Sequence, residues 1–143
     1  MPAAWLVRIL CIAAGVVEVH RVALVEDNED NRILLFALLD GEYELIEFED
    51  GPSALEGLPS AGADVVLLDI SLPGMDGTEV LRRLRADAQT SDLPIVALTA
   101  HAMAGDRERF EAMGFDAYLT KPIVEEDELF GVITRLCESG RSP

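Results

Sequence analysis

The residues best suited to chemistry are three acids that directly follow apolar segments. Glu26 and Asp27 come after a run of four apolar residues, and Asp69 comes after another. If both runs are strands of one parallel sheet, the three carboxylates gather in one crevice, where their repulsion requires a cation. Oxygen ligands in a shallow site that water reaches favour Mg²⁺, which takes one or two carboxylates and keeps several waters. We therefore expect a magnesium site at these acids.

A hydroxyl and an ammonium follow two further apolar segments. Thr99 ends one segment, and Lys121 follows another at 117–120. Phosphoryl transfer depends mainly on alignment and on neutralising spread negative charge, and a carboxylate is the acceptor in aspartyl-phosphate enzymes. A single Asp or Thr at a strand end is more often a cap or a turn residue. Their joint placement with the acids, however, favours phosphoryl transfer to a carboxylate.

The elements that must position these residues alternate between Val22 and Leu136. Short apolar runs separated by amphipathic stretches are typical of repeated βα units around a parallel sheet. Continuously apolar runs predict strands buried on both faces, whereas the more charged second strand predicts a sheet edge. The predicted strands are 21–25, 43–48, 64–69, 94–98 and 117–120.

Helix boundaries are indicated by capping residues, prolines and glycines. The predicted helices run from 28 or 30 to 40, from 52 to about 59, and over about 77–88, 104–113 and 125–137. In the third helix, the helical period turns three apolar side chains inward and turns Arg82, Arg83 and Arg85 toward water. Five strands alternating with five helices predict a doubly wound α/β sandwich, whose ligands bind beyond the carboxyl ends of the strands.

Length and composition limit the function classes. The chain has 143 residues, half of them hydrophobic, which suits one domain with its own core. Eleven Lys and Arg against 27 Asp and Glu give a formal net charge of −16, which repels nucleic acid and anionic lipid. Cys11 and Cys137 lack C-x-x-C spacing and are interpreted as reduced, structural residues of a cytosolic protein.

Four short motifs mark the predicted strand ends. They are Val-Glu-Asp-Asn at 25–28, Leu-Asp-Ile at 68–70 followed by Leu-Pro-Gly-Met-Asp-Gly at 72–77, Leu-Thr-Ala at 98–100, and Lys-Pro at 121–122. Together they resemble the motifs of the response-regulator receiver domain, over about 21–136. Asn31 and the pair Ala102-Met103 make the chain most similar to receivers of hybrid histidine kinases and stand-alone relay regulators. The resemblance implies a flavodoxin-like (βα)5 fold with strand order 2-1-3-4-5.

The resemblance also implies roles for the acids. Asp69 is then the phosphoacceptor, and Asp27 and Asp69 bind Mg²⁺ directly. Glu26 holds the ion through water, and the backbone carbonyl of Ser71 completes the protein ligands.

Residues at the other strand ends receive roles from the same resemblance. Thr99 and Lys121 bind the phosphoryl oxygens, and Tyr118 is a rotamer switch coupled to Thr99. The bond from Lys121 to Pro122 resembles the usual cis peptide of the family. The side chains of Ser71 and His101 tune the lifetime of the phosphorylated state. From the residues alone, a single loop histidine such as His101 is more often a solvated side chain. Tyr118 is a half-buried aromatic residue whether or not it switches.

The implied function is that of a single-domain, cytoplasmic response regulator in two-component signalling. It takes a phosphoryl group from a histidine kinase or a histidine phosphotransfer protein. It signals onward by phosphorelay or by protein contact, through the surface of the predicted helix at 104–113, strand at 117–120 and helix at 125–137. The alternative is a doubly wound hydrolase or phosphatase with an Asp nucleophile. Such enzymes usually carry a second acid two residues after the nucleophile, where this chain has Ser71.

The ends of the chain depart from the family pattern. We expect the receiver to cover 21–138, followed by a short tail at 139–143 too small for an output domain. Residues 1–20 include an apolar run of nine, at 9–17, which is shorter than the roughly 20 residues of a membrane span. Three interpretations stay open: an upstream start-site artefact, an added helix, and a targeting or anchoring segment.

Overall fold

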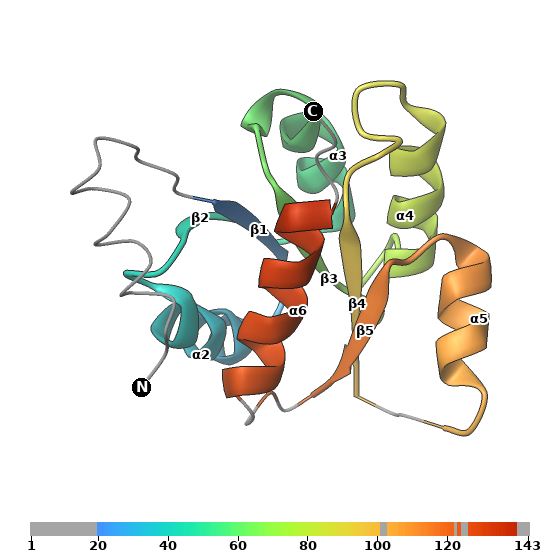
Figure 1. Ribbon diagram of the computed structural model, residues 1–143. Helices are drawn as coiled ribbons and strands as arrows, with labels where there is room; N and C mark the ends of the chain where they lie inside the picture. Colours follow the sequence, from blue (N-terminus) through green and yellow to red (C-terminus); the bar gives the residue numbers. More distant parts are fainter. Residues whose placement is uncertain (1–19, 101–102, 122, 124–125, 140–143) are drawn as a thin grey trace.

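Five parallel strands and five helices make up the part of the chain that the computed structural model describes, residues 20–100, 103–121, 123 and 126–139 (Figure 1). The elements are β1 (Arg21–Val25), α2 (Glu29–Leu39), β2 (Glu44–Phe48), α3 (Gly51–Ala61), β3 (Val65–Asp69), α4 (Gly77–Ala86), β4 (Ile95–Thr99), α5 (Asp106–Met113), β5 (Ala117–Thr120) and α6 (Glu126–Ser139). The strand order is β2-β1-β3-β4-β5. The predicted flavodoxin-like, doubly wound α/β fold is confirmed.

Helices cover both faces of the sheet, α2 and α6 on one side and α3, α4 and α5 on the other (Figure 1). The central strands alternate their side chains between these two cores. Val22, Leu24 and Leu67 pack with the first pair of helices, whereas Ala23 and Leu68 pack with the other three. Because both faces are buried, β1, β3 and β4 read as continuous apolar runs.

The second predicted strand is an edge strand, as its charge indicated. β2 pairs only with β1 among the described strands, with Arg21 opposite Glu44 and Val25 opposite Phe48. Glu44 and Glu47 are exposed. All five predicted strands agree with the observed ones to within one residue at each end.

Four helix ends differ from the prediction by two residues. Two of them are the start of α5, at Asp106 rather than about 104, and the end of α6, at Ser139 rather than about 137. α3 continues through Pro59 to Ala61, and Gly62 caps it in the left-handed conformation at φ +69°. Proline removes only one helical donor, and the buried Leu58 keeps this turn against the sheet. α4 ends at Ala86 rather than about 88, because the hydroxyl of Thr90 donates to the carbonyl of Leu84 at 2.6 Å and the chain turns away at Asp87.

The expectation that Arg85 faces water is wrong. Its guanidinium donates to the carbonyls of Gly114, Ser91 and Leu93, and it pairs with Asp116 at 2.9 Å. The helical period does place the side chain on the outer flank of α4. An arginine is long enough, however, to turn back to the loops that enter β4 and β5.

Several expectations concern residues outside the described part of the chain. They are the interpretations of segment 1–19, the side chains of Cys11 and His101, the peptide bond to Pro122, and the tail at 140–143. Among the described residues, no helix combines the length and the apolar character needed to cross a bilayer.

Candidate functional site

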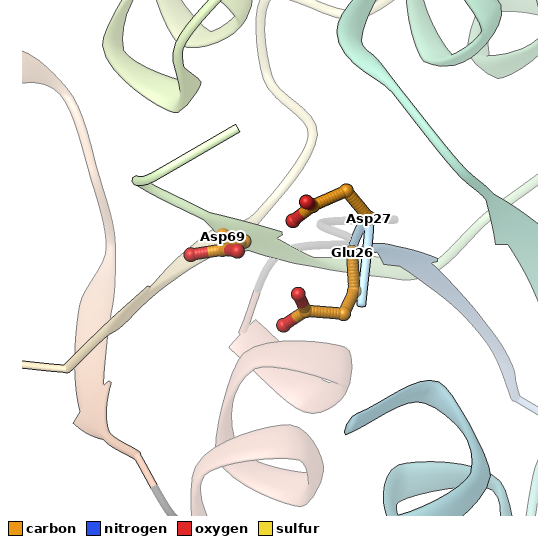
Figure 2. A group of neighbouring side chains, drawn as sticks. All are labelled: Glu26, Asp27 and Asp69. Carbon is orange, nitrogen blue, oxygen red and sulfur yellow. The ribbon is translucent and has the colours of Figure 1, made fainter. Parts of the chain in front are cut away.

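Three acids meet at the carboxyl ends of two neighbouring strands. β1 and β3 pair with Val25 opposite Leu68, so that Glu26 and Asp69 are the next residues along each strand. Carboxylate oxygens of Glu26, Asp27 and Asp69 all lie within 4.8 Å of one another. Glu26 and Asp69 are buried whereas Asp27 is exposed, and Figure 2 shows the carboxylates of Glu26 and Asp27 turned to the side of Asp69. The predicted acidic cluster is therefore present.

Lys121 provides the positive charge of this cluster. Its Nζ lies 3.2 Å from Oε2 of Glu26 and 3.2 Å from Oδ1 of Asp69. The lysine directly follows β5, and its backbone N–H donates to the carbonyl of Thr99 at 2.7 Å. The ends of β1, β3 and β5 thus bring charged side chains together, and the end of β4 is linked to them through the carbonyl of Thr99. A role for the Thr99 hydroxyl stays a prediction.

Burial and neighbouring charges together change the pKa values of Glu26 and Lys121. Burial raises the pKa of Glu26, and the nearby Asp69 carboxylate raises it further, through a shared hydrogen bond and repulsion. The Asn28 N–H and Lys121 offset part of this increase. For Lys121, burial lowers the pKa, but the carboxylates of Asp69 and Glu26 outweigh burial and leave it raised. A single ammonium therefore faces more negative charge than it balances.

The backbone after Asp69 is held close to its carboxylate. Oδ1 of Asp69 accepts a hydrogen bond from the backbone N–H of Ser71 at 3.0 Å, while the side chain of Ser71 is exposed. Helix α4 begins against this segment, because Asp76 caps it by accepting from the N–H groups of Thr78 and Glu79. Its first residue, Gly77, donates to the carbonyl of Ile70 at 2.9 Å.

Gly77 has a role that the sequence analysis missed. A Cβ atom there would lie 2.3 Å from the carbonyl oxygen of Asp69 and 2.8 Å from Cα of Ile70. Both neighbours are backbone atoms, which cannot rotate away. The motif contained this glycine, but only the contact across the β3–α4 loop explains why no larger residue fits.

Arg32 is a second residue that the sequence analysis missed. It lies on α2, and its Nη1 donates to the carbonyl of Glu26 at 2.8 Å and to that of Asp27 at 3.1 Å. No spacing rule for helices pairs a residue with main-chain groups five and six positions earlier, outside the helix. The contact therefore left no signal in the sequence.

The two predicted switch residues lie on neighbouring strands. Thr99 is buried at the end of β4, opposite Thr120 of β5. Tyr118 of β5 is half-buried, and its ring packs against Phe110 of α5 with centroids 5.6 Å apart. This packing agrees with a half-buried aromatic residue, and the switching role of Tyr118 stays a prediction.

The donor set fits a hard divalent cation. All three clustered side chains are carboxylates, without the imidazole or thiolate that softer metals prefer. Asp27 is exposed, so water would reach an ion bound here. This suits Mg²⁺, because Mg²⁺ keeps several waters. The prediction of a magnesium site thus agrees with the chemistry of the cluster.

Comparisons with known proteins agree with this geometry. The family model of the response regulator receiver domain matches residues 22–134. The chain is 45% identical over 109 residues to the sensor protein GacS of Pseudomonas syringae pv. syringae, covering 73% of this chain but 12% of that protein. It is 41% identical over 103 residues to the polar-differentiation response regulator DivK of Brucella ovis, covering 71% of this chain and 84% of DivK.

Solved structures show the same fold. The receiver domain of the sensor histidine kinase PA1611 from Pseudomonas aeruginosa PAO1, described with a magnesium ion coordinated in its active site cleft, has a TM-score of 0.77 and 34% identity, covering 85% of this chain and 100% of that one. The chemotaxis protein CheY4 of Vibrio cholerae has a TM-score of 0.75 and 28% identity, covering 83% and 99%. The chain belongs to the response regulator receiver domain family and is a receiver domain of two-component systems.

Proposed function

We propose that Asp69 accepts a phosphoryl group from a phosphohistidine of a histidine kinase or a histidine phosphotransfer protein. An oxygen of the Asp69 carboxylate attacks phosphorus, the P–N bond breaks, and its electron pair returns to the imidazole, which takes up a proton. The observation that carries this assignment is the position of the Asp69 carboxylate, within 4.8 Å of oxygens of the acid pair and 3.2 Å from Nζ of Lys121. The other two acids, at the end of β1, then serve the cation.

The acids and one carbonyl would hold Mg²⁺ in this proposal. Asp27, Asp69 and the backbone carbonyl of Ser71 would bind the ion directly, and Glu26 would hold it through water. The ion would neutralise phosphoryl oxygens and help to align them with Asp69. The magnesium ion described in the PA1611 receiver and the acidic cluster of this chain both support the assignment.

Lys121 and Thr99 would bind the transferred group. The ammonium of Lys121 already lies 3.2 Å from Asp69, so that it can pair with a phosphoryl oxygen after only a small movement. We propose that the Thr99 hydroxyl donates to a second oxygen. The movement of Thr99 would leave space for the ring of Tyr118, which then turns from its contact with Phe110.

The surface beside the site suits a protein donor. Helix α2 begins two residues after Asp27, and it exposes Ile33, Leu34 and Phe36 to solvent. Exposed apolar side chains grouped on one helix mark a protein contact. We propose that the phosphohistidine protein docks there, because its phosphoryl group must reach Asp69 from the open side of Asp27. Ile33 is the most exposed of the three, at 59%.

The output is proposed to leave through α5, β5 and α6, because Tyr118 connects the site to α5 by its contact with Phe110. The remaining parts of the function are proposals as well. They are a cytoplasmic location, a receiver at 21–138, tuning of the phosphorylated lifetime by Ser71 and His101, and self-catalysed gain and loss of the phosphoryl group.

Acetyl phosphate tests the central assignment. With Mg²⁺ present, intact-protein mass spectrometry should show one phosphoryl group on the parent chain and none on Asp69→Asn. Asp92→Asn is the matched control, because Asp92 is an exposed acid away from the cluster. Equal labelling of the Asp69→Asn variant would contradict the proposal. A hydrolase would instead turn over a generic phosphate ester, which the parent chain should not do.

The coupling to Tyr118 needs a separate measurement. Lys121→Ala should weaken the change that phosphorylation produces at the Tyr118 ring, measured by NMR, more than it lowers stability. An undiminished change at Tyr118 in this variant would remove Lys121 from the switch while leaving Asp69 as the acceptor.

A further inference from the structure

The acid pair at the end of β1 has an unusual geometry for two consecutive residues. In a strand, successive side chains point to opposite faces. Glu26 and Asp27 are adjacent, yet oxygens of both lie within 4.8 Å of a carboxylate oxygen of Asp69. The backbone therefore leaves its extended path here, and it bends at Asp27. This bend is what brings the second carboxylate to the site.

Arg32 holds the backbone of the bend. Its Nη1 donates to two consecutive carbonyls, at 2.8 Å to Glu26 and 3.1 Å to Asp27. Successive carbonyls of a strand point in opposite directions, so that one donor can reach both only where the chain bends. The guanidinium thus contacts the peptide groups on both sides of Asp27's Cα.

The other contacts of Arg32 are weak by comparison. Its Nη2 lies 3.8 Å from Oε1 of Glu49, whose side chain is 80% exposed, and exposed pairs of this kind contribute little. The side chain of Arg32 itself is 15% exposed. The two carbonyls are therefore the main partners of a largely buried cation.

We propose that Arg32 is a positioning residue for the magnesium site. The Arg32 side chain holds the backbone bend at Glu26 and Asp27, so that both carboxylates face Asp69. The inference rests on the proposed function, because it concerns the ion that these acids would bind. Groups that orient metal ligands from behind commonly change metal affinity by about 10- to 100-fold when they are removed.

Charge and geometry predict opposite results for removal of Arg32. A positive charge beside a cation site repels the cation, so loss of the charge alone would tighten binding. Loss of the bend would weaken binding, because Asp27 would no longer be held toward Asp69. The sign of the change in Mg²⁺ affinity therefore distinguishes the effect of the lost charge from the effect of the lost bend.

The experiment is a Mg²⁺ titration of unphosphorylated protein, followed by NMR of backbone amides near Asp27. Arg32→Ala should raise the Kd for Mg²⁺ by about 10-fold. Arg32→Lys keeps the charge but is shorter and lacks the planar donor group, so its Kd should also rise. Arg21→Ala is the matched control. It removes one charge and one arginine contact to a carbonyl, that of Ala61, at the opposite end of β1, and its Kd should equal that of the parent.

Labelling with acetyl phosphate gives a second readout. The rate for Arg32→Ala should fall at limiting Mg²⁺ and return to the parent rate at saturating Mg²⁺. The inference would be overturned if Arg32→Ala left the Kd for Mg²⁺ unchanged or lowered it, or if Arg32→Lys had the Kd of the parent. It would also be overturned if the labelling rate of Arg32→Ala stayed low at saturating Mg²⁺. Failure of the parent itself to bind Mg²⁺ would instead overturn the proposed function.

Discussion

Strand β5 connects two charged clusters that differ in how fully their groups are matched. At its entry, Arg85 reaches three backbone carbonyls and Asp116, and Asp116 also accepts from the N–H of Ile95. At its exit, Lys121 faces Glu26 and Asp69, with Asp27 close by. In the cluster at the entry of β5, the Arg85 guanidinium has a complete set of acceptors, and its contacts connect the loops before β4 and β5. The cluster at the exit has more acids than cations, which leaves it ready for another positive ion.

The strongest test of this contrast is removal of each cation. Arg85→Met should lower the free energy of unfolding by about 3 kcal/mol, because three backbone carbonyls lose a charged hydrogen-bond donor. The pair with Asp116 adds little, since the Asp116 side chain is 41% exposed. Lys121→Met should lose less, since Mg²⁺ can take the place of the ammonium between the acids. Urea unfolding of both variants, with and without Mg²⁺, measures this. If Mg²⁺ restored the free energy of unfolding of Arg85→Met as fully as that of Lys121→Met, the proposed difference in cation binding between the two clusters would be wrong.

Mg²⁺ should stabilise the parent chain itself. Binding to the native form alone contributes about 2.7 kcal/mol at a hundredfold excess over Kd. Asp69→Asn removes one charge from the cluster, so this variant should be more stable than the parent without metal and should gain less from adding it. Thermal melts decide the matter, with Asp116→Asn as the control at the other cluster. If Mg²⁺ did not change the melting temperature of the parent chain, a cation site shared by these acids would be contradicted.

The exit of β3 should tolerate no added methyl group at Gly77. Gly77→Ala places Cβ against the backbone of Asp69 and Ile70, and we expect a loss of about 2 kcal/mol, typical of overpacking, together with slower labelling of Asp69. Gly131→Ala is the matched control. It lies in α6 with no atom within 4 Å of the added Cβ, and it should gain about 0.5–1 kcal/mol from helix propensity. Equal stability of the two variants would show that the contact at Asp69 relaxes.

The smallest effect expected is a dependence of stability on pH in the presence of a chelator. Burial raises the pKa of Glu26 in the folded protein above its ordinary value of 4.5. The folded state therefore binds more protons than the unfolded state between the two pKa values. Its stability should therefore fall as pH rises from 4.5 through the folded pKa. Glu26→Gln should flatten this slope in urea titrations at several pH values. A slope of the same size in the variant would assign the effect to another group.

Most of the site was predictable because its residues directly follow recognisable strands. Glu26 and Asp69 directly follow apolar runs, and Lys121 directly follows the predicted strand at 117–120. The strand order of this fold brings those ends together. What the sequence did not reveal depends on long side chains and close backbone contacts. Arg85 has partners up to 31 residues away, and Arg32 turns back past the start of its own helix. Neither periodicity nor capping rules describe such contacts.

The edge strand β2 has a consequence for the behaviour of the protein at high concentration. β2 is five residues long, and its two glutamates stand exposed on it. An open sheet edge is a template for pairing with another chain, and charged residues on a short edge strand oppose that pairing. Two copies that approached edge to edge would bring like charges together. The same glutamates that identify this strand in the sequence therefore protect the molecule against fibrous aggregation.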